Sequence, residues 1–206
     1  MVIILLRAKG GHLIMKPSHL LAEEIEQIYS MLDILEVMHE QLQNDQPVNL
    51  DDLSRIIHYF RVFVHICHNK KEQHIVFPEL QKSGISMNMG IIKDMQSENQ
   101  LAEFYIFALK KILKDVKKGD KVAEKKLKTM ISKYLNLEKN HIQKEQLFVL
   151  PLCNQEISEE KQEKITAEFK LSDEYEFGSG MHHKFHEAFA KKIKSMQQHY
   201  CKKKSK

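Results

Sequence analysis

A short motif that occurs twice is the strongest constraint on the fold of this chain. Residues 68–78 read HNKKEQHIVFP and residues 141–151 read HIQKEQLFVLP, so His, Lys, Glu, Gln, Val and Pro recur at the same offsets. In each copy the His and the Glu are four residues apart, which on a helix places both side chains on one face. The motif therefore predicts two helices that each present an imidazole and a carboxylate from a single face.

Such pairs are suited to holding a metal ion. Two helices of a bundle that face each other with His and Glu side chains can bind a di-metal centre in the core. The candidate ligands are His68 and Glu72 in the first copy, and His141 and Glu145 in the second. A single His/Glu pair is most often a surface pair. Here the pair is duplicated and lies among apolar residues, which favours a metal site.

The hydrophobic pattern predicts four long helices joined by short loops. These helices cover about residues 17–42, 49–81, 88–117 and 121–152. Asn49 and Asp120 stand where each would cap the helix that follows, and Ser83-Gly84 ends the second helix. We therefore predict an all-α fold, an up-down-up-down antiparallel four-helix bundle. Gly (7) and Pro (4) are scarce, as expected for a helical protein.

Two additional short C-terminal helices are predicted after the bundle. The first is capped by Ser158 and runs to about Lys170, and the second covers about residues 181–199. This pattern divides the chain into three parts. They are an N-terminal extension (1–15), the bundle (16–155) and a C-terminal helical extension with a basic tail (156–206). Whether Met1 or Met15 is the true start stays open.

Composition excludes several classes of partner. The net charge is +4, and no basic stretch is interleaved with aromatic residues, so nucleic-acid binding is not predicted. The apolar run at residues 1–6 is too short to span a membrane. The three cysteines are widely spaced and odd in number, which argues against a disulfide framework. We therefore predict a cytoplasmic protein that binds neither nucleic acid nor membrane.

The chain resembles the hemerythrin-like family, also called the HHE cation-binding domain, over roughly residues 15–190. Residues 63–80 (FVHICHNKKEQHIVFPEL) and 134–151 (YLNLEKNHIQKEQLFVLP) resemble the signatures of the family's second and fourth helices. The resemblance implies a bundle that holds two non-haem irons, and a protein that binds dioxygen or senses oxygen, iron or nitric oxide. It carries over His68, Glu72, His141 and Glu145 as metal ligands. It leaves open the protein partner, and whether the chain forms an oligomer.

Two histidines that the resemblance implies are absent. The family places a His on the first helix where this chain has Ile25, within the segment AEEIEQ. On the third helix it places a His where this chain has Asn99, within SENQ. No His occurs between residues 75 and 140, so no shift of the alignment supplies the second one.

Other side chains are candidates to replace them. His65 precedes His68 by three residues, and Glu138 precedes His141 by three, so each extends a stripe of donors along its helix. Glu103 follows Asn99 by four residues and is expected on the same face. Imidazoles and carboxylates suit iron, manganese or zinc, in a site with one or two ions.

Three functions remain open at this level. The first is a protein that binds or senses dioxygen, nitric oxide or iron without turnover. The second is an oxidoreductase with a carboxylate-rich site, which needs an open coordination position such as Ile25 and Asn99 would leave. The third is a metal-free helical scaffold.

Overall fold

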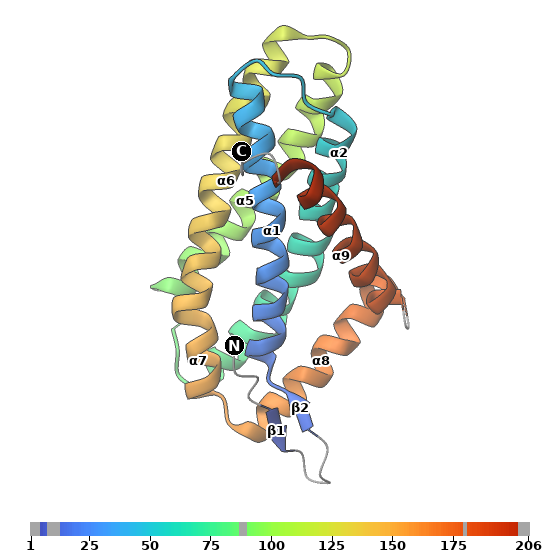
Figure 1. Cartoon of the computed structure of the whole chain (residues 1–206). Coiled ribbons are helices and arrows are strands. Elements are labelled where there is room, and N and C mark those ends of the chain that lie inside the picture. Colours follow the sequence, from blue (N-terminus) through green and yellow to red (C-terminus); the bar gives the residue numbers. More distant parts are fainter. Residues whose placement is uncertain (1–4, 8–12, 87–89, 179–180, 202–206) are drawn as a thin grey trace.

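The computed structural model describes residues 5–7, 13–86, 90–178 and 181–201. Its helices form four long rods, whose arrangement can be followed in Figure 1. A rod is here a continuous run of helical segments, with π-helical stretches labelled η. The first rod is α1 (Pro17–Gln43) and the third is α5 (Ile91–Val116). The second consists of α2 (Leu50–Tyr59), η1 (Phe60–His68), α3 (Asn69–Lys71), η2 (Glu72–Val76) and α4 (Phe77–Lys82). The fourth consists of α6 (Lys121–Lys144), η3 (Glu145–Val149) and α7 (Leu150–Glu156).

The predicted fold class is confirmed: the chain is an antiparallel four-helix bundle followed by two helices. α8 covers Glu159–Phe177 and α9 covers Met181–Tyr200, so α8 is longer than predicted. A feature that the sequence did not reveal is a small antiparallel hairpin of β1 (Leu5–Arg7) and β2 (Leu13–Met15) before α1. Of the basic tail, residues 202–206 lie outside the described residues.

The predicted helix caps are formed at two of three positions. Asn49 Oδ1 accepts the backbone N–H groups of Asp51 and Asp52 at 2.9 and 3.1 Å. Asp120 Oδ1 accepts those of Val122 and Ala123 at 2.8 and 3.1 Å. These bonds satisfy donors that the first turn of a helix leaves unpaired. Ser158 stands at the start of α8, but its side chain makes no capping hydrogen bond.

The core consists of two apolar clusters, and each rod crosses from one to the other. On the first rod the change falls between Ile25 and Leu21, and on the third between Ala102 and Met95. On the second it falls between Val64 and Val76. On the fourth rod Ile142 belongs to one cluster and Val149 to the other. His68, Glu72 and Glu145 lie in these intervals and His141 directly precedes Ile142, so the fold places the motif His and Glu residues in one polar layer between two apolar ones.

The two C-terminal helices pack on the bundle. α9 contacts α1, and α8 contacts α1, η1 and η2 (Figure 1). Ile193, Met196 and Tyr200 are buried in the larger apolar cluster, and Ile165 and Phe169 in the smaller. The domain boundary between residues 155 and 156 stays a prediction.

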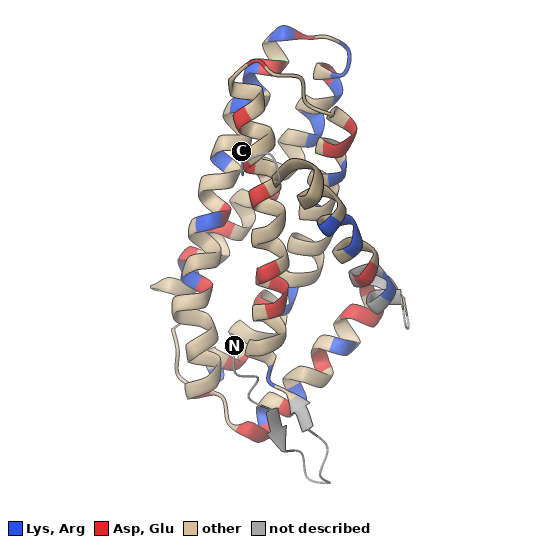
Figure 2. Ribbon diagram, viewed as in Figure 1, with Lys and Arg blue, Asp and Glu red and all other residues tan. Residues whose placement is uncertain are grey.

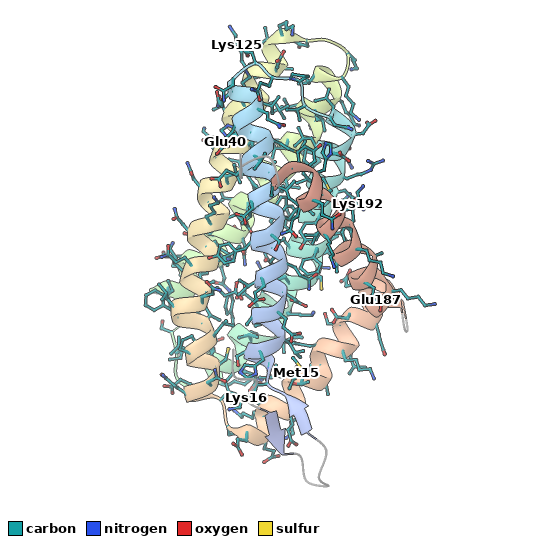
Figure 3. The ribbon with its side chains drawn as sticks, in the orientation of Figure 1. Met15, Lys16, Glu40, Lys125, Glu187 and Lys192 are labelled. Carbon is teal, nitrogen blue, oxygen red and sulfur yellow. The ribbon has the colours of Figure 1, made fainter. Side chains whose placement is uncertain are left out.

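Charges are complementary between neighbouring rods (Figure 2). α1 contains acidic residues but no Lys or Arg, whereas α6 beside it is rich in Lys. Lys139 Nζ accordingly lies 2.7 Å from Glu36 Oε1. Figure 3 shows how Glu40 and Lys125 lie toward one end of the bundle, with Met15 and Lys16 toward the other. Within the part of the chain that is described, no helix combines the length and apolar character needed to cross a membrane.

The cap at Asp120 gives a first testable prediction. Asp120→Ala is expected to lower the free energy of unfolding by about 1 kcal/mol, because two N–H groups lose their acceptor. The measurement is chemical denaturation of the metal-free protein. Ser158→Ala is the matched control, and it should change stability by less than about 0.5 kcal/mol because no cap bond is lost. Equal losses in the two variants would contradict the assignment.

Candidate metal centre

Each motif copy contains a π-helical turn that begins at its glutamate. The Glu72 carbonyl accepts the N–H of Phe77, and the Glu145 carbonyl accepts the N–H of Leu150, five residues on in both cases. Pro78 and Pro151 follow directly. A proline cannot donate to the carbonyl four residues back and its ring collides with that carbonyl. A widened turn before each proline removes the conflict, and such turns are frequent at functional sites. The repeated sequence thus produces the same local geometry twice.

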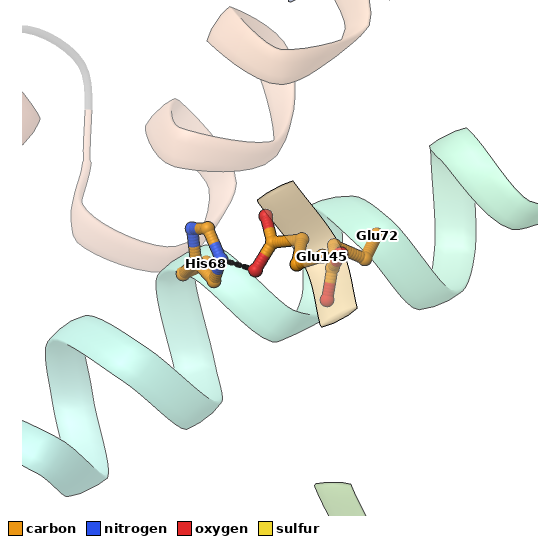
Figure 4. Close-up of side chains that lie close together, drawn as sticks. All are labelled: His68, Glu72 and Glu145. Carbon is orange, nitrogen blue, oxygen red and sulfur yellow. Dashed lines mark hydrogen bonds and ion pairs between the residues drawn. The ribbon is translucent and has the colours of Figure 1, made fainter. Parts of the chain in front are cut away.

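The two turns bring the motif side chains together in the polar layer. His68, Glu72 and Glu145 each offer a ligand atom within 4.8 Å of the others, and all three are buried (Figure 4). His68 Nε2 lies 3.1 Å from Glu145 Oε2. His141 Nε2 lies 3.9 Å from Glu72 Oε2. Each motif histidine therefore faces the glutamate of the other copy.

The outer nitrogen of each histidine contacts a glutamate that the sequence reasoning did not select. His68 Nδ1 lies 2.9 Å from Glu24 Oε2 on α1. His141 Nδ1 lies 3.1 Å from Glu98 Oε2 on α5. These glutamates directly precede Ile25 and Asn99, the positions where histidines were expected. The sequence feature that could have identified them is the acidic residue directly before each of those positions.

Many polar atoms in this layer have no hydrogen-bond partner in the described structure. They are both carboxylate oxygens of Glu72, Glu145 Oε1, Glu138 Oε1, His141 Nε2, His65 Nε2, Tyr134 OH, Asn69 Oδ1 and Asn99 Nδ2. A buried polar atom without a partner costs about 1–3 kcal/mol, so such a concentration indicates a missing partner. A cation fits, because the set consists mainly of carboxylate oxygens and imidazole nitrogens.

Residues 17–153 match the family model of the hemerythrin HHE cation-binding domain. The chain belongs to the hemerythrin HHE family. The match spans all four rods, and it confirms the resemblance seen in the sequence. No curated protein and no solved structure matches the chain. Metal binding is therefore supported by the family and by the geometry of the cluster together.

Of the three candidate replacement ligands, two lie in the polar layer of this hemerythrin-like bundle. Glu138 is buried beside Tyr134, and His65 is buried with its ring centroid 6.2 Å from that of Tyr134. His65 Nδ1 lies 3.2 Å from Asn69 Nδ2, which also donates to Asn99 Oδ1 at 2.9 Å. In this arrangement Nδ1 is an acceptor, so the proton of the neutral ring is on Nε2.

The third candidate, Glu103, lies apart from the cluster. Its side chain is exposed on α5, whereas Asn99 is buried. The buried residues of α5 are Ile92, Met95, Asn99, Ala102, Ile106, Leu109 and Leu113. Their spacing alternates between three and four, and the step after Asn99 is three, to Ala102. A step of four leads instead onto the solvent side of the stripe.

The pKa shifts of the buried groups in the metal-free site are typical of a site that binds a cation. Burial and the neighbouring Glu145 raise the pKa of Glu72 to about 8, because two close carboxylates resist ionising together. Burial alone would lower the pKa of His68, but Glu145 and Glu24 outweigh it and raise that pKa well above its ordinary value. Burial raises the pKa of Glu138 to about 6. Protons thus occupy positions from which a metal ion would displace them.

The stability of the metal-free protein should fall as the pH rises from about 6.5 to about 8. A Glu72 carboxyl with a folded pKa of about 8 and an ordinary value of 4.5 stabilises the fold at low pH, and that contribution is lost on the way to pH 8. The raised pKa values of His68 and His141 act in the same direction. His65, whose pKa burial and His141 lower to about 3, titrates below this window.

Thermal unfolding of chelator-treated protein at both ends of the window measures this effect. Glu72→Gln removes the main titrating group, so its melting temperature should depend less on pH than that of the wild type. A wild-type melting temperature that rises toward pH 8 would contradict the assignment.

Proposed function

We propose that this hemerythrin-like protein binds iron in the polar layer and that the bound metal takes a small diatomic ligand, dioxygen or nitric oxide. His68, Glu72, His141 and Glu145 would hold the metal. The observation that carries the proposal is the buried cluster in which His68, Glu72 and Glu145 converge while three of the four carboxylate oxygens lack a partner. A bound iron would supply Lewis acidity and a redox couple.

Zinc and manganese are alternative metals, since the same donors suit them. The site has room in the proposal for either one ion or two. Cytoplasmic localisation and the absence of a nucleic-acid partner stay predictions from composition.

Metal content per chain after anaerobic reconstitution with ferrous iron tests the proposal. The wild type should retain about one or two irons per chain through desalting, as a bundle with paired His/Glu motifs allows. Glu72→Gln combined with Glu145→Gln should weaken iron binding by more than about 100-fold, because both inner carboxylates are lost.

Glu103→Gln is the matched control, since it makes the same chemical change at an exposed position of the same bundle. It should leave the metal content unchanged. A wild type that retains no iron, zinc or manganese would overturn the proposal in favour of a metal-free scaffold.

A second candidate function, an oxidoreductase, is favoured by the polar groups beside the cluster. His65 Nε2, Tyr134 OH and Glu138 Oε1 are buried without partners, and the Glu138 carboxyl has a pKa of about 6. Reversible binding of dioxygen consumes no protons, whereas its reduction does. A carboxyl group with a pKa of about 6 keeps roughly a tenth of its molecules protonated at pH 7, and it can deliver that proton from its oxygen and be protonated again.

The ferrous protein in air distinguishes the two functions. A binding protein should show a reversible optical change without net oxygen consumption. An oxidoreductase should consume oxygen in the presence of a reductant. In that case Glu138→Gln should slow consumption by about 10²–10⁴-fold, because the proton donor is lost. Iron content should stay at the wild-type level. Unchanged consumption in this variant would exclude Glu138 as the donor.

A further inference from the structure

The lysine that both motif copies share has a role that the metal ligands do not explain. Lys71 and Lys144 each follow the motif histidine by three residues. Lys71 Nζ lies 2.5 Å from Glu24 Oε1, and Lys144 Nζ donates to Glu98 Oε1. These are the same glutamates whose other oxygen contacts the Nδ1 atom of His68 or His141. The same series of contacts, Lys to Glu to His, is therefore built twice, once with α1 and once with α5.

The direction of these hydrogen bonds decides whether the histidines can bind a metal. An ammonium group has donors only, and an ionised carboxylate has acceptors only. A carboxylate paired with the ammonium therefore accepts from the ring, which places the imidazole proton on Nδ1. Nε2 is then the nitrogen that is left for a metal ion. It faces the cluster, where Nε2 of His68 lies 3.1 Å from Glu145 Oε2 and Nε2 of His141 lies 3.9 Å from Glu72 Oε2. Without the lysine, a protonated carboxyl group can donate to the ring, and that leaves the imidazole proton on Nε2.

We propose that Lys71 and Lys144 are positioning residues, which act through Glu24 and Glu98 to keep Nε2 of His68 and His141 available to a metal ion. The inference rests on the proposed metal site and adds how that site is kept ready for binding. It also explains why Lys recurs at the same offset in both copies, although neither lysine faces the cluster.

The two halves of the site differ in burial, so the two lysines should differ in effect. The Lys71 side chain is 3% exposed, and its Nζ also lies 3.0 Å from Asp173 Oδ1 on α8 and 3.4 Å from Cys67 Sγ. The Lys144 side chain is 34% exposed and that of Glu98 is 18% exposed. Water can replace part of what Lys144 supplies, whereas the buried Glu24 depends on Lys71.

Zinc binding to the full-length protein tests the inference, because zinc is diamagnetic and allows the histidine rings to be observed by NMR. Lys71→Met is expected to weaken zinc binding by about 10–100-fold, the effect of losing an outer partner of a metal ligand. Lys144→Met should weaken it by less than about tenfold, because its pair is partly solvated. In both variants the Nδ1 proton signal of the affected histidine should shift or disappear.

Two further lysines provide matched controls. Lys70 neighbours Lys71 and pairs with Glu176 at 2.6 Å, and Lys139 lies on α6 and pairs with Glu36 at 2.7 Å. Neither of these ion pairs contacts a motif histidine. Lys70→Met and Lys139→Met should therefore leave both the zinc affinity and the Nδ1 signals as in the wild type.

Wild-type zinc affinity and unchanged Nδ1 signals in both Lys71→Met and Lys144→Met would overturn the inference. If Lys71→Met does not fold, as judged by circular dichroism, Lys144→Met and Glu98→Gln decide the outcome at the more exposed end. The Nδ1 protons are also read in zinc-free protein. A wild type that shows them but binds no metal would refute the proposed function while leaving the positioning role intact.

Discussion

The structure depends on one constraint: a layer of buried carboxylates and imidazoles must be compensated inside a helix bundle. The layer lies between two apolar clusters, and its inner groups are buried away from water. Each of the four rods contributes a polar side chain there, among them Glu24, Glu72, Asn99 and Glu145. Burying charges in this way is costly unless they are paired or coordinate a cation. The protein compensates the outer groups of the layer itself, and the inner carboxylate oxygens without partners form the candidate metal site.

The compensation follows the internal repeat of the chain. At each end of the layer a lysine, a glutamate and a histidine form a connected set, so the outer charges are satisfied by protein groups. In the centre both carboxylate oxygens of Glu72 and Oε1 of Glu145 remain without a hydrogen-bond partner. In this arrangement the lysines and outer glutamates orient the histidines, whereas the inner carboxylates are the candidate metal ligands.

The C-terminal helices break the symmetry of the repeat. α8 contributes Asp173, which closes the Lys71 end, whereas the Lys144 end has no such cover among the described residues and stays partly exposed. One end of the layer is therefore part of a packed interior, and the other borders solvent. The helices that follow the bundle thus influence the polar layer.

The sequence by itself determined the helices, the caps at Asn49 and Asp120, and the four inner candidates His68, Glu72, His141 and Glu145. These features depend on local spacing, which repeats within one helix and is readable without a partner. Only the tertiary structure showed that Glu24 and Glu98 hold the histidines, because those contacts join different rods. It also moved Glu103 to the surface, since the rotation of α5 in the bundle, not a four-residue spacing from Asn99, decides which side chains face the core.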